Sequence, residues 1–180
     1  DLAEKAAAIN QQAVKAALLA KDAGGNRIKI AGAVGPTGKF IYPLGDLDFE
    51  AAYQAYLTQI TALAAACVDM IIIETIIDIQ EMRAALLAAK QATSLPVICQ
   101  LSFSADGRTI TGTNPETAAA TLSALGASVI GANCSLGPAQ LLPIVTALTA
   151  ACSRPVSVQP NAGLPALVNG QTTYPMKPAE

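Results

Sequence analysis

Residues 70–103 read MIIIETIIDIQEMRAALLAAKQATSLPVICQLSF, and this stretch decides the fold class. The apolar run at 70–73 predicts a strand, residues 79–92 have the apolar spacing of a helix, and residues 96–103 predict a second strand. The strand runs do not alternate between polar and apolar residues, which is typical of buried parallel strands. A strand, a helix and a second strand form one βαβ unit, so the sequence predicts an α/β protein with a parallel sheet.

The same unit repeats on both sides of this stretch. Further strands are predicted at 28–34, 128–132 and 155–158, and further helices at 2–24, 49–67, 115–125 and 138–151. Polar residues at the helix starts predict N-caps at Asp1, Asp48, Asp78, Asn114 and Ser135. No GxGxxG or GxxxxGK[ST] motif follows a strand, which argues against a nucleotide-binding open sheet. We therefore expect a (β/α)8 barrel of the TIM type, of which the five predicted strands form only a part.

The composition limits the class of protein. The chain has 180 residues, of which 52% are hydrophobic and 13% charged; this excludes a disordered tail or a coiled coil and favours a single domain over residues 1–180. The net charge is −2 and no run of lysine or arginine occurs, so we expect no nucleic-acid binding. No apolar run reaches the roughly 18 to 20 residues needed to span a bilayer, so we expect no membrane contact.

Histidine is absent, which excludes Ser-His-Asp and Cys-His catalysis and leaves cysteine and carboxylate side chains to hold any metal. The four cysteines lie far apart without a CxxC pair, which indicates reduced thiols and a cytoplasmic protein. Cys67, Cys99 and Cys152 lie in or beside apolar helix and strand patterns, and we interpret all three as packing residues.

Polar residues follow the predicted strands one after another, at the rim where barrels place their chemistry. Glu74 is either an ordinary carboxylate that caps the next loop or a functional acid at the end of a buried strand. Cys134, which follows Asn133, is either a metal ligand or nucleophile, or a buried free thiol. Ser102 either lines a pocket or caps its strand. The local pattern leaves both alternatives open for each residue.

Four motifs then occur in order along the chain: Val34-Gly35-Pro36-Thr37, Ile72-Ile73-Glu74-Thr75, GANCSLGP at 131–138 and PNAGLP at 160–165. Their order and spacing resemble those of the homocysteine S-methyltransferase domain family, and the resemblance covers nearly the whole chain. Within that family the chain is most similar to the homocysteine-binding module of cobalamin-dependent methionine synthases. The resemblance implies a methyltransferase that converts homocysteine to methionine.

The family fold is a (β/α)8 barrel that holds one zinc ion on three cysteine thiolates. The resemblance identifies Cys134 as the zinc ligand at the end of the sixth strand. The other two ligands belong to a Gly-Gly-Cys-Cys motif after the eighth strand, which this sequence does not contain. The resemblance also implies that Glu74 helps to hold the substrate amino group, and that backbone around Asn133 and Cys134 helps to hold its amino-acid end. Ser102 and Asn133 are further candidates for substrate binding.

By this alignment the chain holds strands three to seven, and we expect its true start to precede Asp1. We favour methylcobalamin as the methyl donor, carried on a separate module and accompanied by a folate module. S-methylmethionine or betaine is the alternative donor, and a non-catalytic barrel fragment completed by other polypeptide is the alternative role. The strands at 28–34 and 155–158 would expose two sheet edges, so we also expect self-association through those edges.

Overall fold

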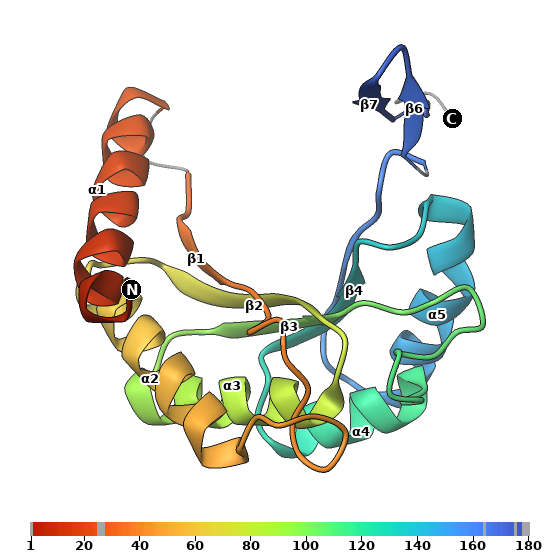
Figure 1. Cartoon of the computed structure of the whole chain (residues 1–180), viewed down its shortest axis with the longest axis horizontal. Helices are drawn as coiled ribbons and strands as arrows, with labels where there is room; N and C mark the ends of the chain where they lie inside the picture. Colours follow the sequence, from red (N-terminus) through yellow and green to blue (C-terminus); the bar gives the residue numbers. More distant parts are fainter. Residues whose placement is uncertain (1, 25–27, 164, 175, 178–180) are drawn as a thin grey trace.

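Five parallel strands form the central sheet of the computed structural model, which describes residues 2–24, 28–163, 165–174 and 176–177 (Figure 1). The strands lie side by side in chain order: β1 (Ala31–Val34), β2 (Met70–Ile76), β3 (Val97–Leu101), β4 (Val129–Asn133) and β5 (Val156–Gln159). Parallel neighbours in chain order are the arrangement of a (β/α)8 barrel. The predicted α/β class and partial barrel arrangement are therefore confirmed.

One helix follows each of the first four strands and lies along the outer side of the curved sheet (Figure 1). These helices are α2 (Phe49–Ala65), α3 (Ile79–Ala92), α4 (Pro115–Ala124) and α5 (Pro138–Ala151). At the start of the chain, the short 3-10 helix η1 (Ala3–Lys5) leads into α1 (Ala6–Gly24), which packs against α2. Within the described ranges, no helix combines the length and the apolar character needed to cross a membrane.

Alternation along the strands separates the two faces of the sheet. The register places Val34 beside Ile73, and it likewise places Cys99 beside Ile130. All four side chains are fully buried, and the alternation places Val34 on the same face as Gly32, whose added Cβ would meet Leu63 of α2. The residues that alternate with them point to the opposite, concave face, where Figure 1 shows no described helix. This concave face corresponds to the interior of a barrel.

The strand bounds differ from the predicted ones at two instructive places. β1 begins at Ala31 rather than at residue 28, because the Ile30 amide donates its hydrogen bond to the Asp69 carboxylate instead of joining the ladder. β2 continues past Ile73 to Ile76 with an irregular register between these two residues, so Glu74 lies within the strand rather than after it.

The helix starts agree largely with the predicted N-caps. The side chains of Asp48, Asp78 and Asn114 each accept hydrogen bonds from backbone amides in the first turn of the helix that follows. The prediction of Ser135 as the cap of α5 is wrong, because Ser135 belongs to a left-handed turn and the N-cap is Gly137. Asp1 lies outside the described residues.

A hairpin of β6 (Ala166–Val168) and β7 (Gln171–Thr173) follows β5 and projects beyond the sheet (Figure 1). It was not predicted. Asn169 and Gly170, both with left-handed backbone, form its turn, and an Asn-Gly pair is the strongest short-range signal for such a hairpin.

Gly131 allows β4 and β5 to approach closely. A Cβ atom at this position would lie 2.0 Å from the carbonyl oxygen of Ser157, so no other residue fits without a shift of backbone. Beside it on the concave face, Gln100 Nε2 donates to Ser157 Oγ at 2.9 Å. Gln100 Oε1 is buried and receives no hydrogen bond from the described residues. Gln100 on β3, Gly131 on β4 and Ser157 on β5 thus form a polar layer on the concave face of the sheet.

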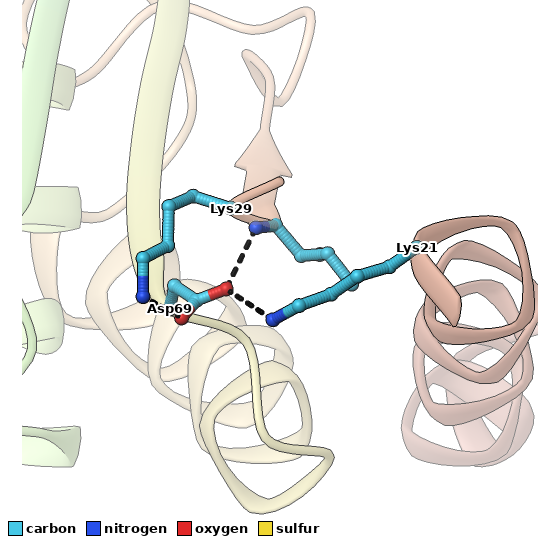
Figure 2. Close-up of polar contacts among 4 residues, drawn as sticks. Lys21, Lys29 and Asp69 are labelled. Atoms are coloured by element: carbon cyan, nitrogen blue, oxygen red, sulfur yellow. Dashed lines mark hydrogen bonds and ion pairs between the residues drawn. The ribbon is translucent and has the colours of Figure 1, made fainter. Parts of the chain in front are cut away.

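Asp69, which directly precedes β2, joins three segments at the amino end of the sheet (Figure 2). Its carboxylate accepts the Ile30 amide at 2.8 Å and lies 3.0 Å from Lys29 Nζ and 3.3 Å from Lys21 Nζ. The hydrogen bond from the Ile30 amide and the Lys29 ammonium lower the pKa of Asp69 to about 2. The ionised carboxylate therefore fastens α1 and the approach to β1 onto β2.

Replacement of Asp69 by asparagine tests this junction. A depressed carboxyl pKa stabilises the fold fully above the unfolded-state pKa of about 3.9, and this stabilisation is lost as the pH falls through about 2. We expect Asp69→Asn to unfold at a lower denaturant concentration than wild type at neutral pH, with a difference that shrinks between about pH 4 and pH 2. Asp22→Asn is the control, because Asp22 is exposed and makes no ion pair or hydrogen bond with a described residue. Equal midpoints at neutral pH would contradict the assignment.

The two outer strands generate a second prediction. In the described part of the chain, β1 and β5 each pair with one neighbour, which leaves one edge of each strand open. Open edges present unpaired amide and carbonyl groups that template further pairing. We propose that the purified chain is completed by other polypeptide or self-associates through these edges, and we expect light scattering to give a multiple of the chain mass. A monomer with cooperative unfolding would show that the open sheet is self-sufficient.

Candidate functional site

The carboxyl ends of β2 and β4 meet through the side chain of Asn133. Its Oδ1 accepts the Thr75 amide at 2.8 Å, and its Nδ2 donates to Thr75 Oγ1, also at 2.8 Å. Thr75 has a φ of 64°, a left-handed conformation that is unusual for a β-branched residue. Asn133 is 2% exposed, so these two hydrogen bonds are shielded from water. The Asn133 amide therefore stabilises a strained backbone at the end of β2.

The Cys134 thiol lies at the same junction. Its Sγ is 3.4 Å from Asn133 Nδ2 and 3.8 Å from Thr75 Oγ1. Cys134 and Ser135 have φ values of 59° and 60°, and the Leu136 amide donates back to the Cys134 carbonyl at 2.6 Å. This tight turn directs the chain away from the sheet and leaves the thiol half-buried at the rim. The thiol is free and half-buried, and its role as a metal ligand or nucleophile stays a prediction.

Ser102, which directly follows β3, supports the junction from between β2 and β4. Its Oγ donates to the Asn133 carbonyl at 2.8 Å, and its amide donates to the Ile76 carbonyl at 2.9 Å. The residue is 3% exposed. The Ser102 hydroxyl thus bonds the last residue of β4. The alternative role, in which Ser102 lines a pocket and contacts substrate, stays a prediction.

Glu74 lies on β2 immediately before Thr75. The alternation of β2 places it on the concave face, and its side chain is half-buried. Its carboxylate makes no hydrogen bond or ion pair with any described residue. A carboxylate in this position is available to a cation that enters the concave face.

The loop after β5 also reaches this rim. The Asn161 amide donates to the Leu136 carbonyl at 3.0 Å, and the Met176 amide donates to the Ala162 carbonyl at 3.2 Å. The PNAGLP motif therefore lies against the turn that follows Cys134, although its residue Leu164 lies outside the described residues.

The other three cysteines lie away from this junction. Cys99 is fully buried, and its burial raises the pKa of the thiol to about 12. Cys152 is half-buried and donates to the Leu148 carbonyl at 3.4 Å. Cys67 is exposed after α2 with a φ of 68°, so its interpretation as a packing residue is wrong.

Comparison with known proteins identifies the family. Residues 1–180 match the family model described as homocysteine S-methyltransferase. The chain belongs to the homocysteine S-methyltransferase family. It is also similar to the methionine synthases of Mycobacterium leprae and Mycobacterium tuberculosis, with 30% identity over 156 residues in both cases. These matches cover 84% of this chain and 13% of each relative, so the chain spans a small part of their length.

Two solved structures share the fold. The apo form of the homocysteine methyltransferase MmuM from Escherichia coli superposes with a TM-score of 0.71 and 22% identity, over 91% of this chain and 62% of that one. Its metallated form gives a TM-score of 0.68 and 21% identity, over 84% and 55% of the respective chains. The homocysteine S-methyltransferase family is thus supported by sequence, and its fold by structure.

The residues present do not complete a zinc site. Among the described residues, no three Cys, Asp or Glu side chains gather closely enough to hold a metal ion. Cys134 is the cysteine at the junction of β2 and β4, whereas a structural or catalytic zinc site takes at least three protein ligands. A zinc ion at Cys134 would therefore need ligands beyond the residues that the structure describes.

Sequence reasoning missed two residues behind the rim, Tyr56 and Glu81. Glu81 is 1% exposed and accepts hydrogen bonds from Tyr56 and from Thr37, which the sequence singled out only as part of a motif. A signal for it was present, because Glu81 precedes the buried Ala85 by four residues and so lies on the apolar face of α3. A carboxylate on such a face indicates a buried hydrogen-bond cluster.

A prediction about zinc binding follows from the presence of one thiol, that of Cys134, at the junction of β2 and β4. We expect the 180-residue chain by itself to bind zinc weakly or not at all, because two further ligands are required and histidine is absent. Elemental analysis of the purified chain checks this expectation. Stoichiometric zinc that disappears in Cys134→Ser, but persists in the matched control Cys67→Ser, would contradict it.

Proposed function

We propose that this chain is the substrate-binding part of a homocysteine S-methyltransferase, in which the sulfur of homocysteine accepts a methyl group to give methionine. The observation that carries the proposal is the meeting of Glu74, Asn133 and Cys134 at one rim of a domain that matches the family over its whole length. In the reaction a sulfur–carbon bond forms, the bond between the methyl group and its donor breaks, and the donor keeps the electron pair of that bond.

Each residue at the rim has a role in this proposal. Glu74 binds the substrate ammonium group, since its carboxylate is half-buried on the concave face and has no partner in the described part of the chain. Asn133 fixes the ends of β2 and β4, and Ser102 holds the Asn133 carbonyl from behind. The backbone around Asn133 and Cys134 then holds the amino-acid end of the substrate.

Cys134 is proposed as one of three thiolate ligands of zinc, with the other two supplied from outside the described residues. A thiol with an ordinary pKa of about 8.5 is mostly protonated at neutral pH, and only the thiolate is a good nucleophile or metal ligand. Binding of the homocysteine sulfur to a metal would therefore favour the thiolate, which is the form of the substrate that must react. The metallated form among the structural neighbours supports a metal in this fold.

Methylcobalamin is the donor that we propose, delivered by a separate module and accompanied by a folate module. The similarity to two methionine synthases supports this choice, because the chain matches 13% of each and leaves room for further modules in those proteins. S-methylmethionine or betaine is the alternative donor. MmuM supports this alternative, because it is a homocysteine methyltransferase with the same fold and is much shorter than the two methionine synthases. A fragment that requires completion by other polypeptide is the alternative role. The four free cysteines favour a cytoplasmic location.

Replacement of Glu74 by glutamine tests the proposed substrate contact. The change removes the charge and keeps the shape, so it deletes a charge-assisted hydrogen bond that contributes about 1.5 to 3 kcal/mol. We expect homocysteine to bind the full-length variant about 10- to 150-fold more weakly by calorimetry, with its metal content unchanged.

Glu116→Gln is the matched control, because Glu116 is an exposed acid in the first turn of α4. Its affinity for homocysteine should equal that of the wild type. Unaltered affinity in Glu74→Gln would favour the interpretation of Glu74 as an ordinary strand residue. A wild-type protein that neither binds homocysteine nor forms methionine with any of the three donors would overturn the proposed function.

A further inference from the structure

The turn after β1 begins at the residue that follows the last paired residue of β1, as Glu74 does on β2. The ladder pairs Val34 with Ile73, and Gly35 and Glu74 are the residues that directly follow this last pair. Gly35 is exposed, and a Cβ atom added to it would meet no other atom within 4 Å. Its backbone does not have a left-handed conformation, so no local strain requires glycine here. A side chain at this position would therefore enter open space at the end of β1.

A buried carboxylate holds this turn from the opposite side. Glu81 Oε1 accepts the Thr37 amide at 2.7 Å, Thr37 Oγ1 at 2.6 Å and the Tyr56 hydroxyl at 2.9 Å. The Tyr56 hydroxyl also lies 3.3 Å from the Gly35 carbonyl. The single hydroxyl proton of Tyr56 goes to Glu81, so Glu81 on α3 holds the Thr37 end of the turn by hydrogen bonds, and Tyr56 on α2 contacts its Gly35 end.

All three hydrogen bonds converge on one oxygen atom, in a place that excludes water. Glu81 is 1% exposed and Tyr56 is 3% exposed. Burial, and then the charge of Glu81, raise the pKa of Tyr56, so its hydroxyl stays protonated and remains a donor. The cluster needs an acceptor at Oε1, which a glutamine side chain also provides.

Packing alone does not fix the turn. A cavity of about 100 Å³ lies beneath it, lined by Pro36, Gly38, Lys39, Phe40, Ile77 and Glu81. A void removes the close contacts that would otherwise hold a segment in place. The hydrogen bonds from Thr37 to Glu81 tie the turn to α3 across this cavity.

We propose that Glu81 is a positioning residue, which acts through Thr37 and Tyr56 to hold Gly35 beside Glu74 and so maintains a slot for the amino-acid end of the substrate. Gly35 is the specificity-determining residue of this slot, because a branched side chain there would enter it. The inference rests on the proposed function, since it concerns the same substrate site.

The first test compares three variants of the full-length protein. Glu81→Gln retains an acceptor at the same place, and we expect its KM for homocysteine to stay within about threefold of wild type. Glu81→Leu removes the acceptor, and we expect KM to rise at least about tenfold while kcat changes much less. Glu116→Leu, which removes an exposed acid from the equivalent turn of α4, should match wild type. A purely structural role would lower the amount of active protein and leave KM unchanged.

The second test does not depend on the buried cluster. Gly35→Val places its side chain in open space, so we expect its thermal unfolding to match that of wild type and its affinity for homocysteine to fall at least about tenfold. Wild-type affinity in Gly35→Val, or a wild-type KM in Glu81→Leu, would overturn the inference while leaving the proposed function intact. A wild-type protein that does not bind homocysteine would overturn both.

Discussion

The side-chain amide of Asn133 is the interaction on which the candidate site depends. It reaches across the end of β3 to bind both the amide and the hydroxyl of Thr75, and its own carbonyl is held by Ser102. Three strand ends are thereby fixed relative to one another by side chains, in a region where the regular ladder has already become irregular. The left-handed conformations of Thr75 and Cys134 exist within this network, which offsets their backbone strain.

The two ends of the sheet have different roles: the amino end holds a stabilising junction, and the carboxyl end holds the candidate site. At the amino end, Asp69 ties α1 and the start of β1 to β2 with an ionised carboxylate whose partners are all within the chain. At the carboxyl end, the carboxylate of Glu74 has no partner in the described residues and faces the concave side. This division agrees with the general pattern of parallel α/β barrels, in which function lies at the carboxyl ends of the strands and stability at the opposite end.

Much of this architecture is predictable from the sequence, because it is determined by local patterns. The apolar run around Ile72 predicts β2, and Asp78 and Asn114 predict the starts of their helices since capping is a short-range interaction. The motif residues predict a rim at the carboxyl ends of the strands. The bond between Asn133 and Thr75 is not predictable in this way, because it joins residues from non-adjacent strands and depends on an irregular register. Glu81 was missed for a related reason: its partners Thr37 and Tyr56 come from distant parts of the chain.

The polar layer at Gly131 has a consequence for whatever covers the concave face. Gln100 donates a hydrogen bond from its side-chain NH2 group to Ser157, while its side-chain carbonyl oxygen remains buried without a partner in the described residues. An unsatisfied buried acceptor costs about 1 to 3 kcal/mol, and an apolar cover would leave that cost in place. Because this oxygen has no accessible surface, a donor reaches it only if the Gln100 side chain moves or a small donor such as water enters the layer. The polar layer therefore has a hydrogen-bond requirement that a covering surface does not meet by contact alone.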